Sequence, residues 1–147
     1  MIAIVGTGKF TNFLIRNLDE KDYFLISGTK KNDSKIAFMG KNLDKIHSLK
    51  LPIDITHCII NWSHTYISKF SKFKDAIKGF ENLSVFMINN PEVNYVFISS
   101  TSADSEVNRH SLYGLSKFMA EDIFIKVKSK IPKINIHIVR LGMIYGL

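Results

Sequence analysis

The chain has 147 residues, of which 46% are hydrophobic and 22% charged, and its formal net charge is +7 at pH 7. This composition predicts one soluble globular domain over residues 1–147. The single cysteine, Cys58, excludes an internal disulfide, and its apolar neighbours predict a buried, inert thiol. The N-terminus has no signal-peptide pattern and no segment approaches a membrane-spanning length, so we expect a cytoplasmic protein without a membrane partner.

The positive charge is compatible with an anionic partner, but the lysines are spread from Lys9 to Lys133 without a long basic block. The aromatic residues do not alternate with arginines as they would on a platform for single-stranded nucleic acid. We therefore expect a solvated lysine-rich surface and no nucleic-acid partner.

Short β-rich runs alternate along the chain with segments of helical periodicity. The pattern predicts strands at Met1–Val5, Tyr23–Ile26, His57–Trp62, Tyr95–Ile98 and Ile134–Val139, and helices at Phe10–Leu18, Phe70–Asn89 and Tyr113–Lys130. Between residues 29 and 56 the pattern is ambiguous, and it favours the start of a short helix at Ile36–Met39 and a poor strand at Ile46–Leu51.

This alternation predicts an α/β fold, a Rossmann-like doubly wound parallel sheet with helices on both faces. Ligands of such sheets bind beyond the carboxyl ends of the strands. The candidate sites are therefore the loops that follow Val5, Ile26, Ile60, Ile98 and Val139.

The first of these loops, Gly6-Thr7-Gly8-Lys9-Phe10-Thr11, runs directly into the first predicted helix. It is close to the dinucleotide fingerprint Gly-x-Gly-x-x-Gly. Gly6 would permit the tight turn, and Gly8 would let a pyrophosphate approach the backbone. Thr11 takes the third position, where a small residue normally lets the helix pack closely on the strand. The loop favours a nucleotide site, and a plain glycine turn is the alternative.

The loop after the second strand bears on the choice of cofactor. An acidic residue at this strand end binds the ribose 2′-hydroxyl of NAD, whereas a basic residue accommodates the 2′-phosphate of NADP. Here Thr29, Lys30 and Lys31 follow the strand, and no acidic residue occurs before Asp33. The loop therefore favours NADP over NAD, with a solvated basic turn as the alternative.

A third group of polar residues follows the strand Tyr95–Ile98, in the run Ser99-Ser100-Thr101-Ser102. Thr101 and Ser100 lie 12 and 13 residues before Tyr113, which begins the next predicted helix. A hydroxyl at the end of this strand and the phenol of Tyr113 would then meet in one cleft. Lys117 follows Tyr113 by one helical turn and is predicted to face the same side.

These motifs together resemble the short-chain dehydrogenase/reductase superfamily in its extended type, the NAD-dependent epimerase/dehydratases. The most specific part is Tyr-Gly-x-Ser-Lys followed by Arg-x-Gly-x-x-Tyr-Gly. The resemblance runs in chain order through the glycine loop, Gly79–Leu83, Val96–Thr101, Tyr113–Lys117 with Ala120-Glu121, and Val139–Gly146.

The resemblance implies an enzyme that transfers hydride between a nicotinamide cofactor and a nucleotide sugar or related carbonyl, as in polysaccharide biosynthesis. It makes Tyr113 the general acid/base, and Lys117 the cation that lowers the pKa of this phenol and holds the nicotinamide ribose. Thr101, with Ser100 as the second choice, would bind the substrate oxygen. No metal site is predicted.

The resemblance also implies that the loop Asn61-Trp62-Ser63-His64 borders the cofactor, although the family has His-x-Ala-Ala there and Trp62 is expected to crowd the ligand. Ala76 stands where the family has an asparagine. Family members continue into a further substrate-binding part, so a second hypothesis is a truncated, non-catalytic dinucleotide-binding module that acts as a sensor or assembly partner. For the enzyme we expect a partner subunit to supply the substrate-binding part, and for the module we expect a homodimer that covers the edge of the sheet.

Overall fold

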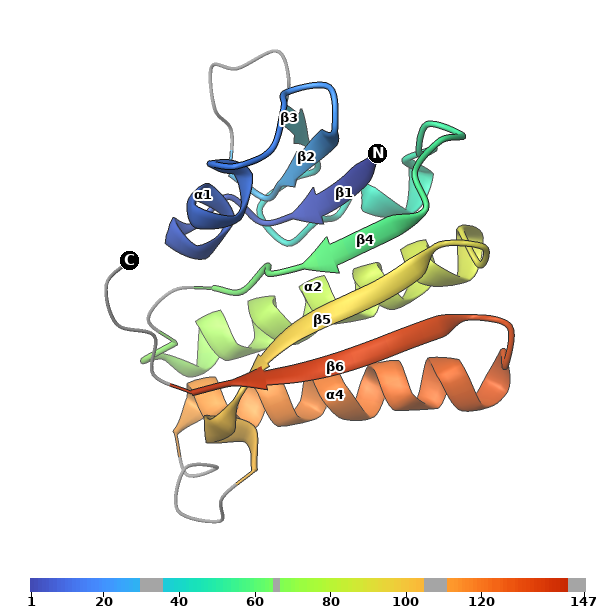
Figure 1. Ribbon diagram of the computed structural model, residues 1–147. Helices are drawn as coiled ribbons and strands as arrows, with labels where there is room; N and C mark the ends of the chain where they lie inside the picture. The colour runs from blue at the N-terminus through green and yellow to red at the C-terminus, as the bar shows by residue number, and fades with distance from the viewer. Residues whose placement is uncertain (30–35, 65–66, 105–110, 143–147) are drawn as a thin grey trace.

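Six short runs, most of them apolar, form the strands of one sheet in the computed structural model, which describes residues 1–29, 36–64, 67–104 and 111–142 (Figure 1). The elements in chain order are β1 (Ile2–Val5), α1 (Lys9–Ile15), β2 (Tyr23–Ser27), β3 (Ile36–Phe38), the 3-10 helix η1 (Ile46–Ser48), β4 (His57–Ile60), α2 (Phe70–Asn89), β5 (Asn94–Ser100), the 3-10 helix η2 (Thr101–Ala103), α4 (Leu112–Lys130) and β6 (Asn135–Leu141).

The sheet has the strand order β3-β2-β1-β4-β5-β6, and every pair of neighbours is parallel. The chain builds outward from β1 to β2 and β3, and then continues on the other side of β1 with β4. The order therefore reverses between β1 and β4, and ligands bind beyond such a reversal in open α/β sheets. The predicted Rossmann-like fold is confirmed.

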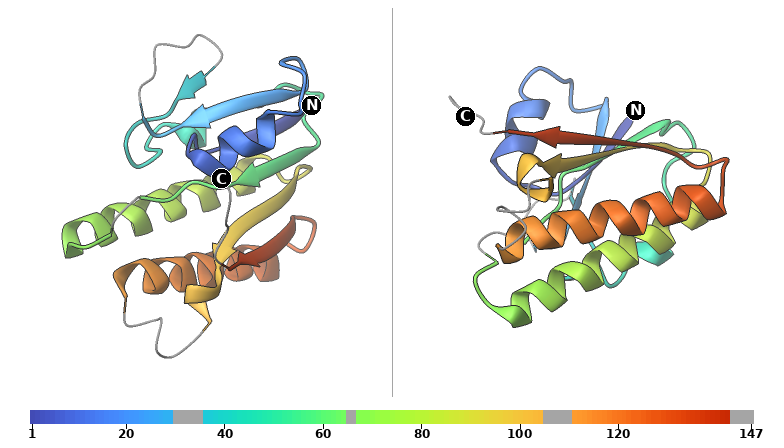
Figure 2. Two further views of the ribbon diagram at one scale, coloured as in Figure 1. Left: turned by 60° about the vertical axis from the view of Figure 1, so that its left-hand side comes forward. Right: turned by 90° about the horizontal axis from the view of Figure 1, so that it is seen from below.

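Helices cover the sheet from both sides, with α2 and α4 next to each other on one face and α1 on the other (Figure 2). The core between the sheet and the helix pair is aromatic. Phe97 of β5 packs edge-to-face against Phe124 of α4 and Phe80 of α2, with ring centroids 4.9 and 5.8 Å apart. Cys58 of β4 is also fully buried, which confirms the predicted buried thiol, and burial raises the pKa of this thiol to about 12. Among the described helices, none has the length and apolar character needed to cross a membrane.

Two short elements differ from the sequence-based expectation. The expected helix at residues 36–39 is wrong, because Ile36–Phe38 pairs in parallel with Leu25–Ser27 and so satisfies backbone groups at the edge of β2. The expected strand at residues 46–51 is also wrong. Ile46 begins a 3-10 turn, is fully buried, and is held against α2 where Asn89 Nδ2 donates to the His47 carbonyl at 3.1 Å.

Trp62, two residues after β4, packs its indole into a notch over Gly79 of α2. A Cβ atom added to Gly79 would lie 2.0 Å from Cη2 and 2.4 Å from Cζ3 of Trp62. The indole also makes edge contacts with the rings of Phe80 and His64, at centroid distances of 5.3 and 5.1 Å. Only 6% of Trp62 is exposed, so most of this large side chain is accommodated by the helix.

Gly79→Ala is expected to destabilise the fold by about 1–3 kcal/mol, because the added methyl group overpacks the notch. Elsewhere in a helix the same change stabilises by roughly 0.5–1 kcal/mol. Urea denaturation followed by circular dichroism measures the difference. The control is Gly8→Ala, whose Cβ meets nothing within 4 Å and should leave stability unchanged. A Gly79→Ala protein as stable as the wild type would contradict this packing.

Candidate functional site

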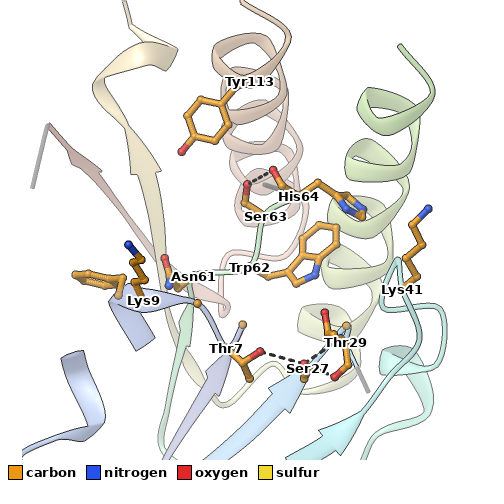
Figure 3. A pocket seen from close by; sticks show the side chains of 14 residues that line it. Thr7, Lys9, Ser27, Thr29, Lys41, Asn61, Trp62, Ser63, His64 and Tyr113 are labelled. Carbon is orange, nitrogen blue, oxygen red and sulfur yellow. Dashed lines mark hydrogen bonds between the residues drawn. The ribbon is translucent and has the colours of Figure 1, made fainter. Parts of the chain in front are cut away.

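A cleft of about 670 Å³ opens at the carboxyl ends of β1, β2 and β4 (Figure 3). Residues 6–10 after β1, 27–29 at the end of β2 and 61–64 after β4 line it, together with Lys41 and Tyr113. Its volume lies in the range of roughly 300–1,000 Å³ that is typical of small-molecule and cofactor sites. The cleft stands at the reversal of strand order, where the fold is expected to bind a ligand.

Most of the predicted cofactor-binding residues meet in this cleft. The lining includes, from the predicted set, Gly6, Thr7, Gly8, Lys9, Phe10, Thr29, Asn61, Trp62 and Ser63. Lys30 and Lys31, on which the choice of NADP partly rests, lie outside the described residues, as do residues 143–146 of the last family motif. The predicted catalytic residue Tyr113 lines the cleft as well, whereas Ser100, Thr101 and Lys117 do not.

The two glycines of the loop differ in whether their place in the structure could accommodate a side chain. Gly6 has φ +111°, and a Cβ there would stand 3.0 Å from the backbone of Asn61 and Trp62. Gly6 is therefore required both by its positive φ and by the close approach of the chain after β4. Gly8 has nothing within 4 Å of an added Cβ, so open space lies beside it.

Thr11, at the third position of the glycine motif, is buried and hydrogen-bonded to two neighbouring segments. The side chain is fully buried, and its Oγ1 donates a hydrogen bond to the Gly6 carbonyl at 2.9 Å. The Nδ2 of Asn61 donates to the same Oγ1 at 3.2 Å. The hydroxyl thus links the glycine loop, α1 and the loop after β4, which explains why a residue larger than glycine fits here.

Hydroxyl groups also hold the end of β2 against the glycine loop. Ser27 Oγ donates to the Thr29 carbonyl at 2.8 Å and accepts from the Thr29 amide at 3.0 Å. The Oγ1 of Thr7 lies 3.2 Å from Ser27 Oγ (Figure 3). The turn after β2 is therefore tied to the first loop, and both border the same cleft.

Tyr113 lines the cleft from the start of α4, away from Ser27 and Thr29 (Figure 3). Burial raises the pKa of its phenol, and the Ser100 side chain at the end of β5 offsets part of that rise. Thr101, the first choice for the substrate-binding hydroxyl, is exposed. Of these two hydroxyl residues, Ser100 is the one that acts on the Tyr113 pKa.

Lys117 does not share the cleft with Tyr113, although it follows one helical turn later. It is 3% exposed, and its Nζ donates to the Ile98 carbonyl at 3.0 Å. The ammonium also lies 4.9 Å from the ring centroid of Phe97. Burial lowers the pKa of Lys117 to about 8, an effect that Glu121 partly opposes. Burial raises the pKa of Tyr113. The lowering of that pKa by Lys117 together with a nicotinamide stays a prediction.

An ion pair between the buried Glu121 of α4 and the partly exposed Arg140 of β6, to which the sequence assigned no role, joins these two elements. Arg140 donates from Nε and Nη2 to the carboxylate of Glu121, at 3.0 and 2.6 Å, and Ser99 donates its hydroxyl to the same group. Arg140 Nη1 also lies 2.7 Å from Asp104, just after η2. Hydrogen bonding to Glu121 is the main cause that raises the pKa of Arg140. The cluster holds together the ends of β5 and β6 and the helix that carries Tyr113.

Comparison with known proteins gives matches among solved structures only: no family model matches this sequence and no curated protein matches it. The UDP-N-acetylglucosamine 4-epimerase of Bacillus cereus aligns with 99% of the chain, at 21% identity and a TM-score of 0.75. A short-chain dehydrogenase/reductase superfamily protein from Agrobacterium tumefaciens with bound NAD aligns with 95%, at 14% identity and a TM-score of 0.71. The dTDP-glucose 4,6-dehydratase of Bacillus anthracis, in complex with NAD, aligns with 95%, at 12% identity and a TM-score of 0.63.

These likenesses show the fold: the chain has the Rossmann-like α/β architecture of these proteins. The chain spans about half the length of each, namely 54%, 48% and 53% of the three solved chains.

The buried ammonium of Lys117 predicts a particular dependence of stability on pH. Its pKa falls from 10.5 to about 8 on folding, so between these values the folded state binds fewer protons than the unfolded state. The free energy of unfolding should therefore gain about 2–3 kcal/mol from this residue as the pH rises through that interval. Urea denaturation at pH 7.5 and 9.5 should show this gain in the wild type relative to Lys117→Met, which lacks the titrating group.

The wild type and Lys117→Met share all other groups that titrate at high pH. The difference between their free energies of unfolding therefore reports on Lys117. Lys130→Met, a change at an exposed position of the same helix, is the matched control and should follow the wild type. A difference between Lys117→Met and the wild type that is the same at both pH values would exclude the buried ammonium.

Proposed function

We propose that this chain is the dinucleotide-binding part of an NAD(P)-dependent enzyme of the short-chain dehydrogenase/reductase type. The enzyme is an oxidoreductase or an epimerase/dehydratase that acts on a nucleotide sugar or a related carbonyl. One observation carries the proposal: a single cleft at the reversal of strand order contains the glycine loop, the end of β2, the loop after β4 and Tyr113. The three aligned proteins named above support it as relatives in fold.

The residues of the cleft fit a dinucleotide. The open space beside Gly8 leaves room for a group to approach the backbone of the glycine loop, as the pyrophosphate of a dinucleotide does. Residues 27–29 would contact the adenosine ribose, and residues 61–63 would border the nicotinamide half. A bound nicotinamide would supply hydride transfer, and this chain's residues would bind and orient it.

NADP is the favoured cofactor, although NAD is the dinucleotide bound in two of the aligned structures. Among the described residues that line the cleft there is no aspartate or glutamate. Within the described part of the chain, the end of β2 therefore offers no carboxylate to accept a hydrogen bond from a ribose 2′-hydroxyl, which is the usual means of selecting NAD. The hydroxyl of Thr29, which lines the cleft, is a donor suited to a phosphate.

In the catalytic form of the proposal, Tyr113 exchanges a proton with the substrate oxygen, and Ser100, whose side chain acts on the Tyr113 pKa, would bind that oxygen. Lys117 would support the site from the adjacent helical turn. The pKa of a free tyrosine is about 10, and burial raises that of Tyr113 further, so near neutral pH the phenol holds its proton and would act first as the proton donor.

The alternative is a non-catalytic dinucleotide-binding module, and the position of Lys117 favours it. Its ammonium is occupied with the Ile98 carbonyl and the face of Phe97. Neither the cation nor a lowered tyrosine pKa is then available to the chemistry. Such a module would bind the same dinucleotide without turning it over, as a sensor or as part of an assembly.

Binding is testable through Trp62, the only tryptophan of the chain, which lines the cleft. NADPH and NADH are each expected to quench its fluorescence and to enhance their own. Gly8→Val places a branched side chain in the open space beside the loop, and it should weaken both cofactors about tenfold or more while the unfolding midpoint stays unchanged. A wild-type protein that binds neither cofactor would refute the proposal.

Turnover separates the enzyme from the module. Nucleotide sugars are incubated with the protein and the bound cofactor, and nicotinamide absorbance and product formation are followed for the wild type and Tyr113→Phe. Turnover that falls about 100-fold or more in the variant is expected for acid/base catalysis. Cofactor binding without turnover in either protein identifies the module.

A further inference from the structure

A group of polar side chains that the sequence did not single out lies at the β2 end of the cleft. Lys41, three residues after β3, and His64, four residues after β4, both line the cleft (Figure 3). A Cβ added to Gly28 would stand 3.1 Å from the Lys41 carbonyl oxygen and 2.9 Å from the indole Nε1 of Trp62. The chain after β3 therefore touches the end of β2, where folds of this type recognise the 2′ position of the adenosine ribose.

The ammonium of Lys41 is held at this place by Asp75 of α2, with Nζ 2.8 Å from Oδ2. The lysine side chain is 71% exposed and that of the aspartate 32% exposed. The hydrogen bond from Lys41 is the main cause that lowers the pKa of Asp75, so the carboxylate is ionised at neutral pH. An exposed pair of this kind contributes little to stability, and its lysine is free to take another anion.

The loop that carries Lys41 is anchored without help from this ion pair. Asn82 Nδ2 of α2 donates to the Asn42 carbonyl at 2.9 Å. Leu43, the next residue, is fully buried, and the Lys45 amide donates to the Met39 carbonyl at 2.9 Å. The Lys41 side chain can thus leave Asp75 while its backbone keeps its position beside β2.

The neighbouring histidine, His64, is an uncharged member of the group, and Asn42 holds its ring. The Nδ2 of Asn42 donates to Asp75 Oδ1 at 3.4 Å, so the Asn42 Oδ1 is the atom that accepts from His64 Nε2 at 3.2 Å. Burial is the main cause that lowers the pKa of His64, which is therefore neutral near pH 7. Among the described residues that line this end of the cleft, the positive charge resides on Lys41.

We infer that Lys41 is a specificity-determining residue, which exchanges the Asp75 carboxylate for the 2′-phosphate of a phosphorylated dinucleotide. This inference rests on the proposed function, because it requires a dinucleotide in the cleft. A phosphate carries more charge than a carboxylate and is a preferred partner of a lysine ammonium. Asp75 plays the opposite role, since it competes for Lys41 and repels the phosphate. The ratio of affinities for the two cofactors therefore depends on the balance between these two side chains.

The test compares the dissociation constants of NADPH and NADH, which differ only in the 2′-phosphate, by quenching of Trp62 fluorescence at low ionic strength. Lys41→Met should weaken NADPH about tenfold and change NADH by less than about twofold. Asp75→Asn keeps an acceptor for Asn42 but removes the charge, and it should strengthen NADPH about threefold with NADH unchanged.

The matched control is Lys78→Met, at a lysine of α2 that does not line the cleft. This variant also removes one positive charge and one ion pair, because Lys78 lies 3.6 Å from the Glu81 carboxylate. This variant should leave both constants unchanged. Equal effects of Lys41→Met on NADPH and NADH, or weaker NADPH binding by Asp75→Asn, would overturn the inference and leave the proposed function intact. A wild-type protein that binds neither dinucleotide would overturn both.

Discussion

The contact between the Trp62 indole and Gly79 is the constraint on which the cleft depends. The absence of a side chain at Gly79 lets the largest residue of the chain lie flat on α2 directly after β4. The indole then reaches Gly28 at the end of β2 with its Nε1 edge and touches Phe80 in the core with its ring. One side chain thus sets the distance between the sheet and α2 and forms part of the cleft wall. A residue that was expected to obstruct a ligand is instead accommodated mainly by the helix.

Buried polar groups complete the frame on both sides of this contact. On the glycine-loop side, the hydroxyl of Thr11 links Gly6 to Asn61. On the other side, the carboxylate of Glu121 binds Arg140 and Ser99 where β5, β6 and α4 come together. Because a buried polar group that loses its partner is costly, each of these links holds its backbone segments in a definite relation. They keep the loops of the cleft fixed relative to the start of α4.

The state of Tyr113 and Lys117 decides how the candidate site works. Burial raises the pKa of Tyr113, so its phenol holds the proton, and the ammonium of Lys117 donates to a backbone carbonyl. The aligned proteins share the fold, and this chain spans about half of their length. The proposed dinucleotide binding is argued from the cleft that the described residues line. The proposed catalysis also needs a substrate beside Tyr113, and the described residues are assigned only to the cofactor and to the proton transfer.

Much of the fold was predictable, because apolar runs and helical periodicity are local properties of the sequence. The bounds of α2 agree with the predicted helix at Phe70–Asn89, and each of the five predicted strands is present. The segment between residues 36 and 51 was predicted wrongly, since Ile36–Phe38 becomes a strand only by pairing with β2. Had this strand been identified, the loop after it would have counted as a carboxyl-end loop. Lys41 would then have been a candidate from the sequence.

The sequence by itself determined the order of elements, the glycine loop and the residue types that gather at the carboxyl ends of the strands. The tertiary structure alone decided which of these side chains meet. Helical spacing places Lys117 one turn after Tyr113, but packing against Phe97 draws its ammonium to the Ile98 carbonyl. Lys41 meets Asp75 across 34 residues of chain. Periodicity specifies the face on which a residue lies, whereas its partner depends on how that face packs against distant segments.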